Sequence, residues 1–124
     1  MYIIEAVSKL DHLKHNTYSY SDKVRWLSSL DSRVMKEVIS THELPGPVHF
    51  VGYDETTNVH DILLLIPEPY DEVYIRWMEA QIDYSNGEYG KYNNSIEMFN
   101  ALWRDYVNWY NRNYMPKGKT LKFF

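Results

Sequence analysis

The sequence contains no cysteine, which excludes a disulfide framework and a thiolate metal site. Long apolar runs are also missing, since the longest one, Ile62 to Ile66, is far too short to span a bilayer. The first residues lack a basic segment followed by an apolar run, so we expect no signal peptide. These absences predict a soluble intracellular protein with no membrane partner.

Positive charge is not in excess, because 13 Lys and Arg residues face 17 Asp and Glu residues, for a net charge of −4. Such a chain is not suited to tight binding of a phosphate backbone. Basic residues gather only near the end, where they alternate with apolar ones. We interpret this segment as an extended docking tail that adds a strand to a partner or places anchors in its pockets, with a frayed terminus as the alternative. Its binding residues would be Lys117, Lys119, Leu121, Lys122, Phe123 and Phe124.

Catalytic motifs are missing as well, including a G-x-S-x-G turn and a glycine-rich phosphate loop. His12 and His15 are three residues apart, but a pair without a third ligand is a weak metal signal, and two solvent-facing histidines explain it. Glu79 and Asp83 lie four apart near Arg76, which indicates surface charge pairing on a helix. We therefore expect no enzyme, no cofactor and no metal.

Aromatic residues are what the sequence has in abundance, with 12 Tyr and 4 Trp among 124 residues. The hydrophobic share of 44% is ordinary and allows one domain with a core. Tyr and Trp combine a large apolar body with a polar tip, so they suit half-buried helix faces and subunit interfaces. Both uses remain open at this point.

The strongest pattern lies near the C-terminus, where steps of three and four residues alternate as in a heptad repeat. The positions of this seam are all apolar or aromatic: Tyr89, Tyr92, Ile96, Phe99, Trp103, Tyr106 and Tyr110. A seam this regular needs a partner helix. We predict that the partner is Pro69–Ser85, which presents Tyr74 and Trp77 and is joined through the turn Asn86-Gly87.

The N-terminal part predicts two further helices and a small β element. Ile3, Val7 and Leu10 recur at helical spacing, and a second helix should run from an N-cap at Ser21 to about Thr41. Two short β-branched and aromatic runs, Val48 to Tyr53 and Ile62 to Ile66, predict strands of a hairpin or extended arm. The expected fold is mainly α: a four-helix bundle-like domain over residues 1–116, with an insertion at about 47–66 and a tail at 117–124.

Residues 65 to 116 also carry a pattern of short motifs. It includes Leu65-Ile66-Pro67-Glu68-Pro69-Tyr70-Asp71, Ala80-Gln81-Ile82-Asp83-Tyr84, Tyr92-Asn93-Asn94-Ser95, Phe99-Asn100, Tyr110 and Pro116. With the N-terminal helix pair ahead of it, the chain resembles the head-to-tail adaptor (head-completion) proteins of long-tailed bacteriophages and prophages. None of these motifs is catalytic.

The resemblance implies a helical subunit that assembles as a ring of about a dozen copies beneath the portal protein. Viral DNA would pass through without tight binding, and a stopper or tail-completion protein would bind below. The C-terminal arm would reach the portal, and the protein would reside in the virion neck after assembly in the bacterial cytoplasm. The alternative is a prophage-encoded helical DNA-binding or regulatory protein, although no helix shows a clustered basic recognition face.

Overall fold

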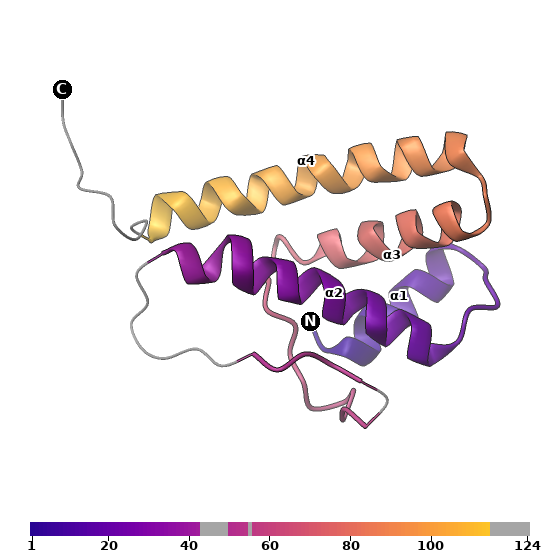
Figure 1. Cartoon of the computed structure of the whole chain (residues 1–124), viewed down its shortest axis with the longest axis horizontal. Helices are drawn as coiled ribbons and strands as arrows, with labels where there is room; N and C mark the ends of the chain where they lie inside the picture. The colour runs from indigo at the N-terminus through magenta and orange to yellow at the C-terminus, as the bar shows by residue number, and fades with distance from the viewer. Residues whose placement is uncertain (43–49, 55, 115–124) are drawn as a thin grey trace.

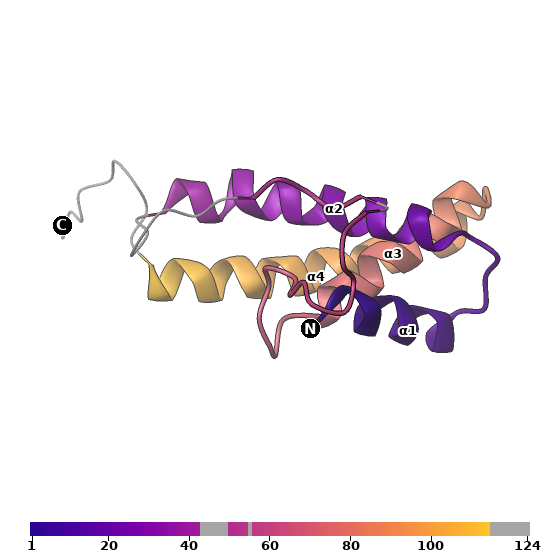
Figure 2. The same ribbon diagram turned by 90° about the horizontal axis from the view of Figure 1, so that it is seen from below.

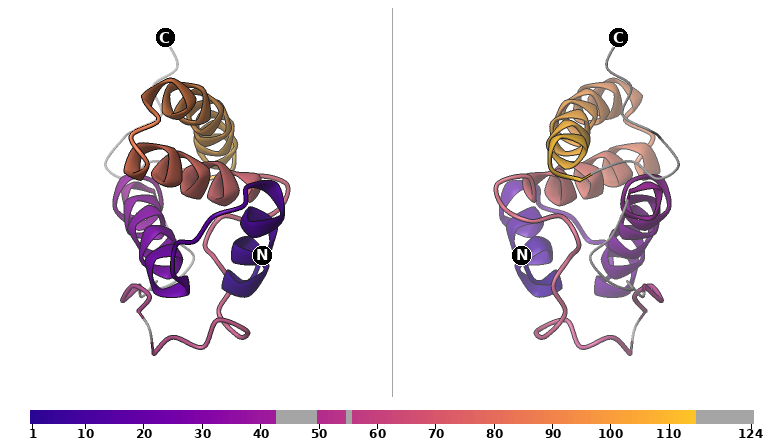
Figure 3. Two further views of the ribbon diagram at one scale, coloured as in Figure 1. Left: turned by 90° about the vertical axis from the view of Figure 1, so that its right-hand side faces the viewer. Right: turned by 90° about the vertical axis from the view of Figure 1, so that its left-hand side faces the viewer.

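The computed structural model describes residues 1–42, 50–54 and 56–114. Its helices are α1 (Ile3–Leu13), α2 (Tyr20–Glu37), α3 (Glu72–Ser85) and α4 (Tyr89–Asn113), with a 3-10 turn η1 (Ile39–Thr41) after α2. Helix α3 occupies the middle and contacts each of the other three (Figure 1). Viewed end-on, α4 covers one side of α3, while α1 and α2 lie on the other (Figure 3). The predicted mainly helical, bundle-like fold is confirmed.

The α3–α4 hairpin is the most extensive helix pair, as the heptad seam predicted. The turn between the helices works because Gly87 adopts a positive φ of 73°, which glycine tolerates without steric cost. Burial of the seam is graded along α4: Phe99, Tyr106 and Tyr110 are buried, whereas Tyr89 at the turn is 61% exposed. The remaining seam positions, Tyr92, Ile96 and Trp103, are half-buried. The seam therefore packs tightly in the middle of α4 and at its C-terminal end and loosens toward the turn.

Helices α1 and α2 complete the core from the other side of α3. The predicted stripe Ile3, Val7 and Leu10 is buried. The predicted start of α2 is wrong by two positions, since the N-cap is Ser19 and not Ser21. The Ser19 hydroxyl accepts a hydrogen bond from the backbone N–H of Asp22 at 3.1 Å, which satisfies a donor at the helix start.

The predicted β-hairpin is not seen. Residues 50–54 and 56–66, which we call the strap, contain no strand in the described part of the chain, and Val48 and His49 lie outside it. The strap makes one isolated antiparallel bridge, from Leu63 to Tyr2. Figure 2 shows the strap running from α2 across to the N-terminal end of α1. It is an extended connection that closes the open side of the bundle.

The reason is that side chains of the helices take up the strap's backbone donors. The N–H of Tyr53 donates to the Ser28 hydroxyl at 2.9 Å, and the N–H of Leu65 donates to the Asp31 carboxylate at 3.1 Å. The N–H of Ile66 donates to the Tyr74 hydroxyl at 2.7 Å. Because these donors are satisfied by helices, they are not available for a ladder between two strands.

Helix α3 begins later than the sequence predicted, at Glu72 and not at Pro69. The residues before it form a turn in which the N–H of Tyr70 donates to the carbonyl of Pro67 at 2.9 Å. The proline-rich segment therefore serves as the exit from the strap. Asp71 occupies the N-cap position.

We predict that Phe99→Ala lowers the free energy of unfolding by about 3–5 kcal/mol, because the fully buried ring would leave a cavity between α3 and α4. The matched control is Tyr89→Ala on the same seam, where the exposed ring should cost less than about 0.5–1 kcal/mol. Urea denaturation followed by circular dichroism measures both. Equal losses in the two variants would contradict the graded burial of the seam.

Candidate functional site

A buried carboxylate, Asp31 of α2, holds the centre of the molecule together. Its side chain is 0% exposed. One oxygen accepts from the Tyr74 hydroxyl at 2.6 Å, and the other accepts from the Tyr53 hydroxyl at 2.5 Å and the Leu65 N–H at 3.1 Å. The carboxylate thus joins α2, α3 and both parts of the strap, residues 50–54 and residues 56–66.

No cationic side chain of the described residues pairs with this carboxylate. Burial therefore raises the pKa of Asp31, and the hydrogen bonds from Tyr53, Tyr74 and Leu65 lower it only in part. Burial and the nearby carboxylate likewise raise the pKa of Tyr53 and of Tyr74 above the ordinary phenol value. Both tyrosines thus remain hydrogen-bond donors at neutral pH.

This arrangement is suited to holding the strap and not to reaction with a substrate. Asp31 has no contact with solvent, so in this conformation its carboxylate cannot reach a molecule outside the protein. The sequence carried a signal for the cluster, because Asp31 interrupts the apolar stripe of Leu27, Leu30 and Val34 with an acid. The partners Tyr53 and Tyr74 lie on other elements, so spacing along α2 could not identify them.

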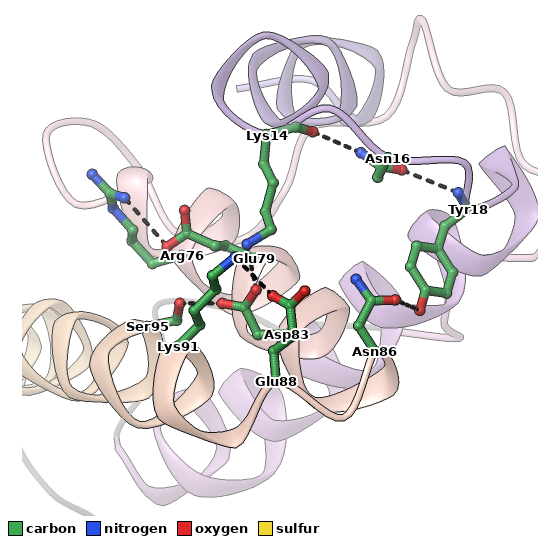
Figure 4. Close-up of polar contacts among 10 residues, drawn as sticks. All are labelled: Lys14, Asn16, Tyr18, Arg76, Glu79, Asp83, Asn86, Glu88, Lys91 and Ser95. Carbon is green, nitrogen blue, oxygen red and sulfur yellow. Dashed lines mark hydrogen bonds and ion pairs between the residues drawn. The ribbon is translucent and has the colours of Figure 1, made fainter.

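A second polar cluster lies where α1, α3 and α4 meet, around Asp83 (Figure 4). Asp83 is 1% exposed and accepts hydrogen bonds from the Lys14 ammonium group and, at 2.6 Å, from the Ser95 hydroxyl. The prediction that Asp83 belongs to a surface ion pair is therefore wrong. Its side chain points between α1 and α4, so it joins three helices instead of pairing with Arg76.

The cluster lines a shallow cleft of about 260 Å³ between α3 and α4. Arg76 pairs with Glu79 at 3.4 Å, as the sequence predicted, and also with Glu72 at 3.7 Å. Lys91 at the rim pairs with Glu88 at 3.1 Å. Each cation of the cleft thus has a carboxylate partner, and a charged ligand would have to break one of these pairs to bind.

The end of α2 is fixed to α4 by His42, which is buried. Its Nδ1 lies 2.6 Å from the carbonyl of Val38, and its Nε2 lies 2.6 Å from the Asn111 side chain. The imidazole also meets the Tyr110 ring edge-on at 4.7 Å. The last described residue before the gap at 43–49 is therefore held against the last turns of α4.

Most of the predicted helix-pairing residues lie between α2, α3 and α4, whereas Tyr92 contacts Tyr84 near the hairpin turn and Ile96 is half-buried. Tyr74, Phe99 and Tyr106 are buried, and the Trp77 and Phe99 rings are 5.0 Å apart. Trp103 is half-buried, and the Arg33 guanidinium of α2 lies 4.4 Å from the centre of its ring. Spacing along the sequence could not reveal this cation–π contact, because its two residues lie on different helices.

The predicted tail residues lie outside the described part of the chain, which ends at Tyr114. The side chains of His12 and His15 are exposed on and after the last turn of α1. Within residues 1–42, 50–54 and 56–114, no group of three or more His, Asp or Glu side chains is placed to hold a metal ion.

Comparison with protein-family models, with curated proteins and with solved structures finds no match to this chain. No helix in the described residues is both long enough and apolar enough to cross a membrane. A function for this chain is therefore proposed below from its own sequence motifs and its geometry.

We predict that the stability difference between Asp31→Asn and the wild type depends on pH. Because the folded-state pKa of Asp31 is raised, its contribution to wild-type stability is complete below its ordinary value of 3.8 and is lost as the pH rises through the folded-state pKa. The Asp31→Asn variant lacks this titrating group. Its stability relative to the wild type should therefore rise as the pH increases from 3.8 to the folded-state pKa of Asp31, and the difference should be constant at higher pH. Urea denaturation at a series of pH values measures it.

The companion variant Tyr53→Phe removes one hydrogen bond that lowers the pKa of Asp31. In this background the pH interval over which Asp31→Asn gains relative stability should move upward. A stability difference that stays flat with pH would show that Asp31 does not titrate differently in the folded chain.

Removal of the Asp83 carboxylate should loosen α1. We predict that Asp83→Ala lowers the free energy of unfolding by about 2–3 kcal/mol, since the Lys14 ammonium and the buried Ser95 hydroxyl lose their partner. The control Glu88→Gln breaks the exposed pair with Lys91 and should cost less than about 1 kcal/mol. Thermal or urea denaturation distinguishes them, and similar losses would refute a special role for Asp83.

Proposed function

We propose that this chain is a structural assembly protein, a head-to-tail adaptor that binds beneath a bacteriophage portal as a ring and links the head to the stopper and tail. The observation that carries the proposal is the motif pattern of residues 65–116. It coincides with the strap exit and the α3–α4 hairpin, the most extensively packed part of the molecule. A rigid rod of this kind suits a subunit whose role is to set distances between partners.

The tip of this hairpin supports a role in subunit contact. Tyr84 and Tyr89 are 59% and 61% exposed, and their rings lie 5.9 Å apart. Tyr92 meets Tyr84 at 5.4 Å, so the three rings form one aromatic surface at the end of the rod. Exposed clustered tyrosines are typical of the centres of protein interfaces. In the proposed ring this surface would contact a neighbouring subunit.

The charges of the helices support passage of DNA without tight binding. Arg25 pairs with Asp22 at 2.7 Å and Arg33 with Glu37 at 2.6 Å on α2, and Arg76 and Lys91 are paired as described above. Cations neutralised by neighbouring carboxylates contribute little to phosphate binding. This favours an assembly subunit over the alternative, a prophage-encoded helical DNA-binding or regulatory protein.

The proposal predicts that the chain binds the portal protein of the phage that encodes it, and that deletion of residues 117–124 abolishes this binding while the helical fold persists. The tail would supply apolar anchors and positive charge to the portal. Co-sedimentation with purified portal particles measures binding, circular dichroism measures the fold, and electron microscopy of the mixture shows whether a ring forms.

The matched control keeps the eight tail residues but scrambles their order, so that charge and length are unchanged. Loss of binding in this variant as well would assign the interaction to the tail sequence, and not to its charge alone. If the full-length chain does not sediment with the portal, or the truncated chain sediments as well as the full-length one, the proposal fails.

A further inference from the structure

The strap carries an open apolar groove. A cavity of about 390 Å³ lies between the two parts of the strap, residues 50–54 and residues 56–66. Its apolar lining consists of Phe50, Val51, Ile62, Leu63 and Leu65. Val51 is 95% exposed and Leu63 is 57% exposed, which is unusual for aliphatic residues grouped around one depression. Within the described part of the chain, nothing covers these two side chains.

The groove also offers a short backbone edge. On one side Leu63 forms an antiparallel bridge with Tyr2. The hydrogen bonds of this bridge are donated by the N–H of Ile3 to the carbonyl of Ile62 and by the N–H of Leu64 to the carbonyl of Met1. The N–H and C=O of Leu63 itself have no partner among the described residues. An unpaired edge beside apolar side chains is a site where an extended segment can add.

Charge is strongly segregated between the strap and the C-terminal segment. Residues 37–75 contain no Lys or Arg, and two of their acids, Asp54 and Asp61, are exposed on the strap beside the groove. Hydrogen bonds from Thr56 lower the pKa of Asp54, so it carries its charge at neutral pH. In contrast, residues 106–124 contain no Asp or Glu, and their four cations are Arg112, Lys117, Lys119 and Lys122.

The tail is also long enough to reach the groove. Helix α4 ends beside His42, because Tyr114 stacks on Tyr110 at 4.4 Å and Tyr110 meets His42 at 4.7 Å. From His42 the chain needs eight residues to arrive at Phe50, the first residue of the groove. Leu121 and Phe123 lie seven and nine residues beyond Tyr114, so a tail at roughly 3.3–3.6 Å per residue can cover a comparable path.

We propose that the C-terminal residues 117–124 dock in the strap groove of the same chain, with Leu121 and Phe123 against Phe50, Val51 and Leu63 and the lysines beside Asp54 and Asp61. Attachment to the same chain favours this contact over one with another molecule, because the tail is present at a high effective concentration. The inference rests on the groove, the charge and the reach, and it does not depend on the proposed assembly role. A partner that takes the tail would first have to displace it from the strap.

Paramagnetic NMR on the full-length chain tests the proposal. The natural chain has no cysteine, so Thr120→Cys gives one site for a nitroxide in the tail. The backbone amide signals of Val51 and Leu63 should lose most of their intensity and regain it when the nitroxide is reduced. A nitroxide at Ser85→Cys, the last residue of α3 and exposed near the hairpin turn, should leave these two signals unchanged.

Introduction of positive charge into the groove provides the second arm of the test. Val51→Lys with Leu63→Lys should abolish the broadening, because both side chains are exposed and the new charges repel the tail. The control Leu13→Lys places the same charge on another exposed leucine, 48% exposed on α1, and should leave the broadening intact.

Three results would overturn the proposal. The first is an absence of broadening at Val51 and Leu63 when the tail carries the nitroxide. The second is broadening that survives in the Val51→Lys, Leu63→Lys chain. The third is broadening that appears equally when isotope-labelled chains without nitroxide are mixed with spin-labelled ones, since the tail would then bind another molecule. None of these measurements involves the portal, so their outcome is separate from that of the assembly experiment.

Discussion

The fold depends on a buried carboxyl group with which no cation of the described residues pairs. Asp31 lies at the centre of the bundle, and its hydrogen-bond donors among the described residues are neutral, namely two tyrosine hydroxyls and a backbone N–H. A buried carboxylate without these donors would be costly, so the strap and α3 must come to it for the fold to close. This constraint turns an irregular connection of the chain into a fixed part of the molecule.

The Asp83 cluster lies at the other end of α3, and unlike Asp31 its carboxylate has a cationic partner. There a partly buried lysine from α1 and a serine from α4 converge on one carboxylate, so that three helices share a single acceptor (Figure 4). Helix α3 thus receives a polar tie near each end and apolar packing between them. The tyrosine-rich tip of the α3–α4 hairpin and the apolar groove of the strap remain exposed. Helices tied together in this way, with exposed contact surfaces, are consistent with the proposed assembly role.

Much of the helical architecture could be predicted from periodicity, because a helix face is a local property of the sequence. The spacing of Ile3, Val7 and Leu10 and the seam through Phe99 and Tyr106 identified buried positions that the structure confirms. Of the two alternatives predicted for the insertion, a β-hairpin or an extended segment, the described residues show the extended segment and not the hairpin. The β-branched and aromatic character of Ile62 to Ile66 reflects burial against the helices, since Leu64 and Ile66 enter the core. Composition cannot distinguish an extended segment that packs on helices from a strand that pairs with another strand.

The sequence alone determined the number and approximate bounds of the helices, the α3–α4 turn, the lack of thiol chemistry and the segregation of charge between the strap and the C-terminal segment. Only the tertiary structure decided the roles of Asp31 and Asp83, although the place of Asp31 within an apolar stripe marked it as unusual along the chain. Their roles depend on Tyr53, Tyr74, Lys14 and Ser95, which lie on other elements, 12 to 69 positions away. Local patterns report what a residue contributes to its own helix, whereas burial and hydrogen bonding of a polar group are fixed by which elements meet around it.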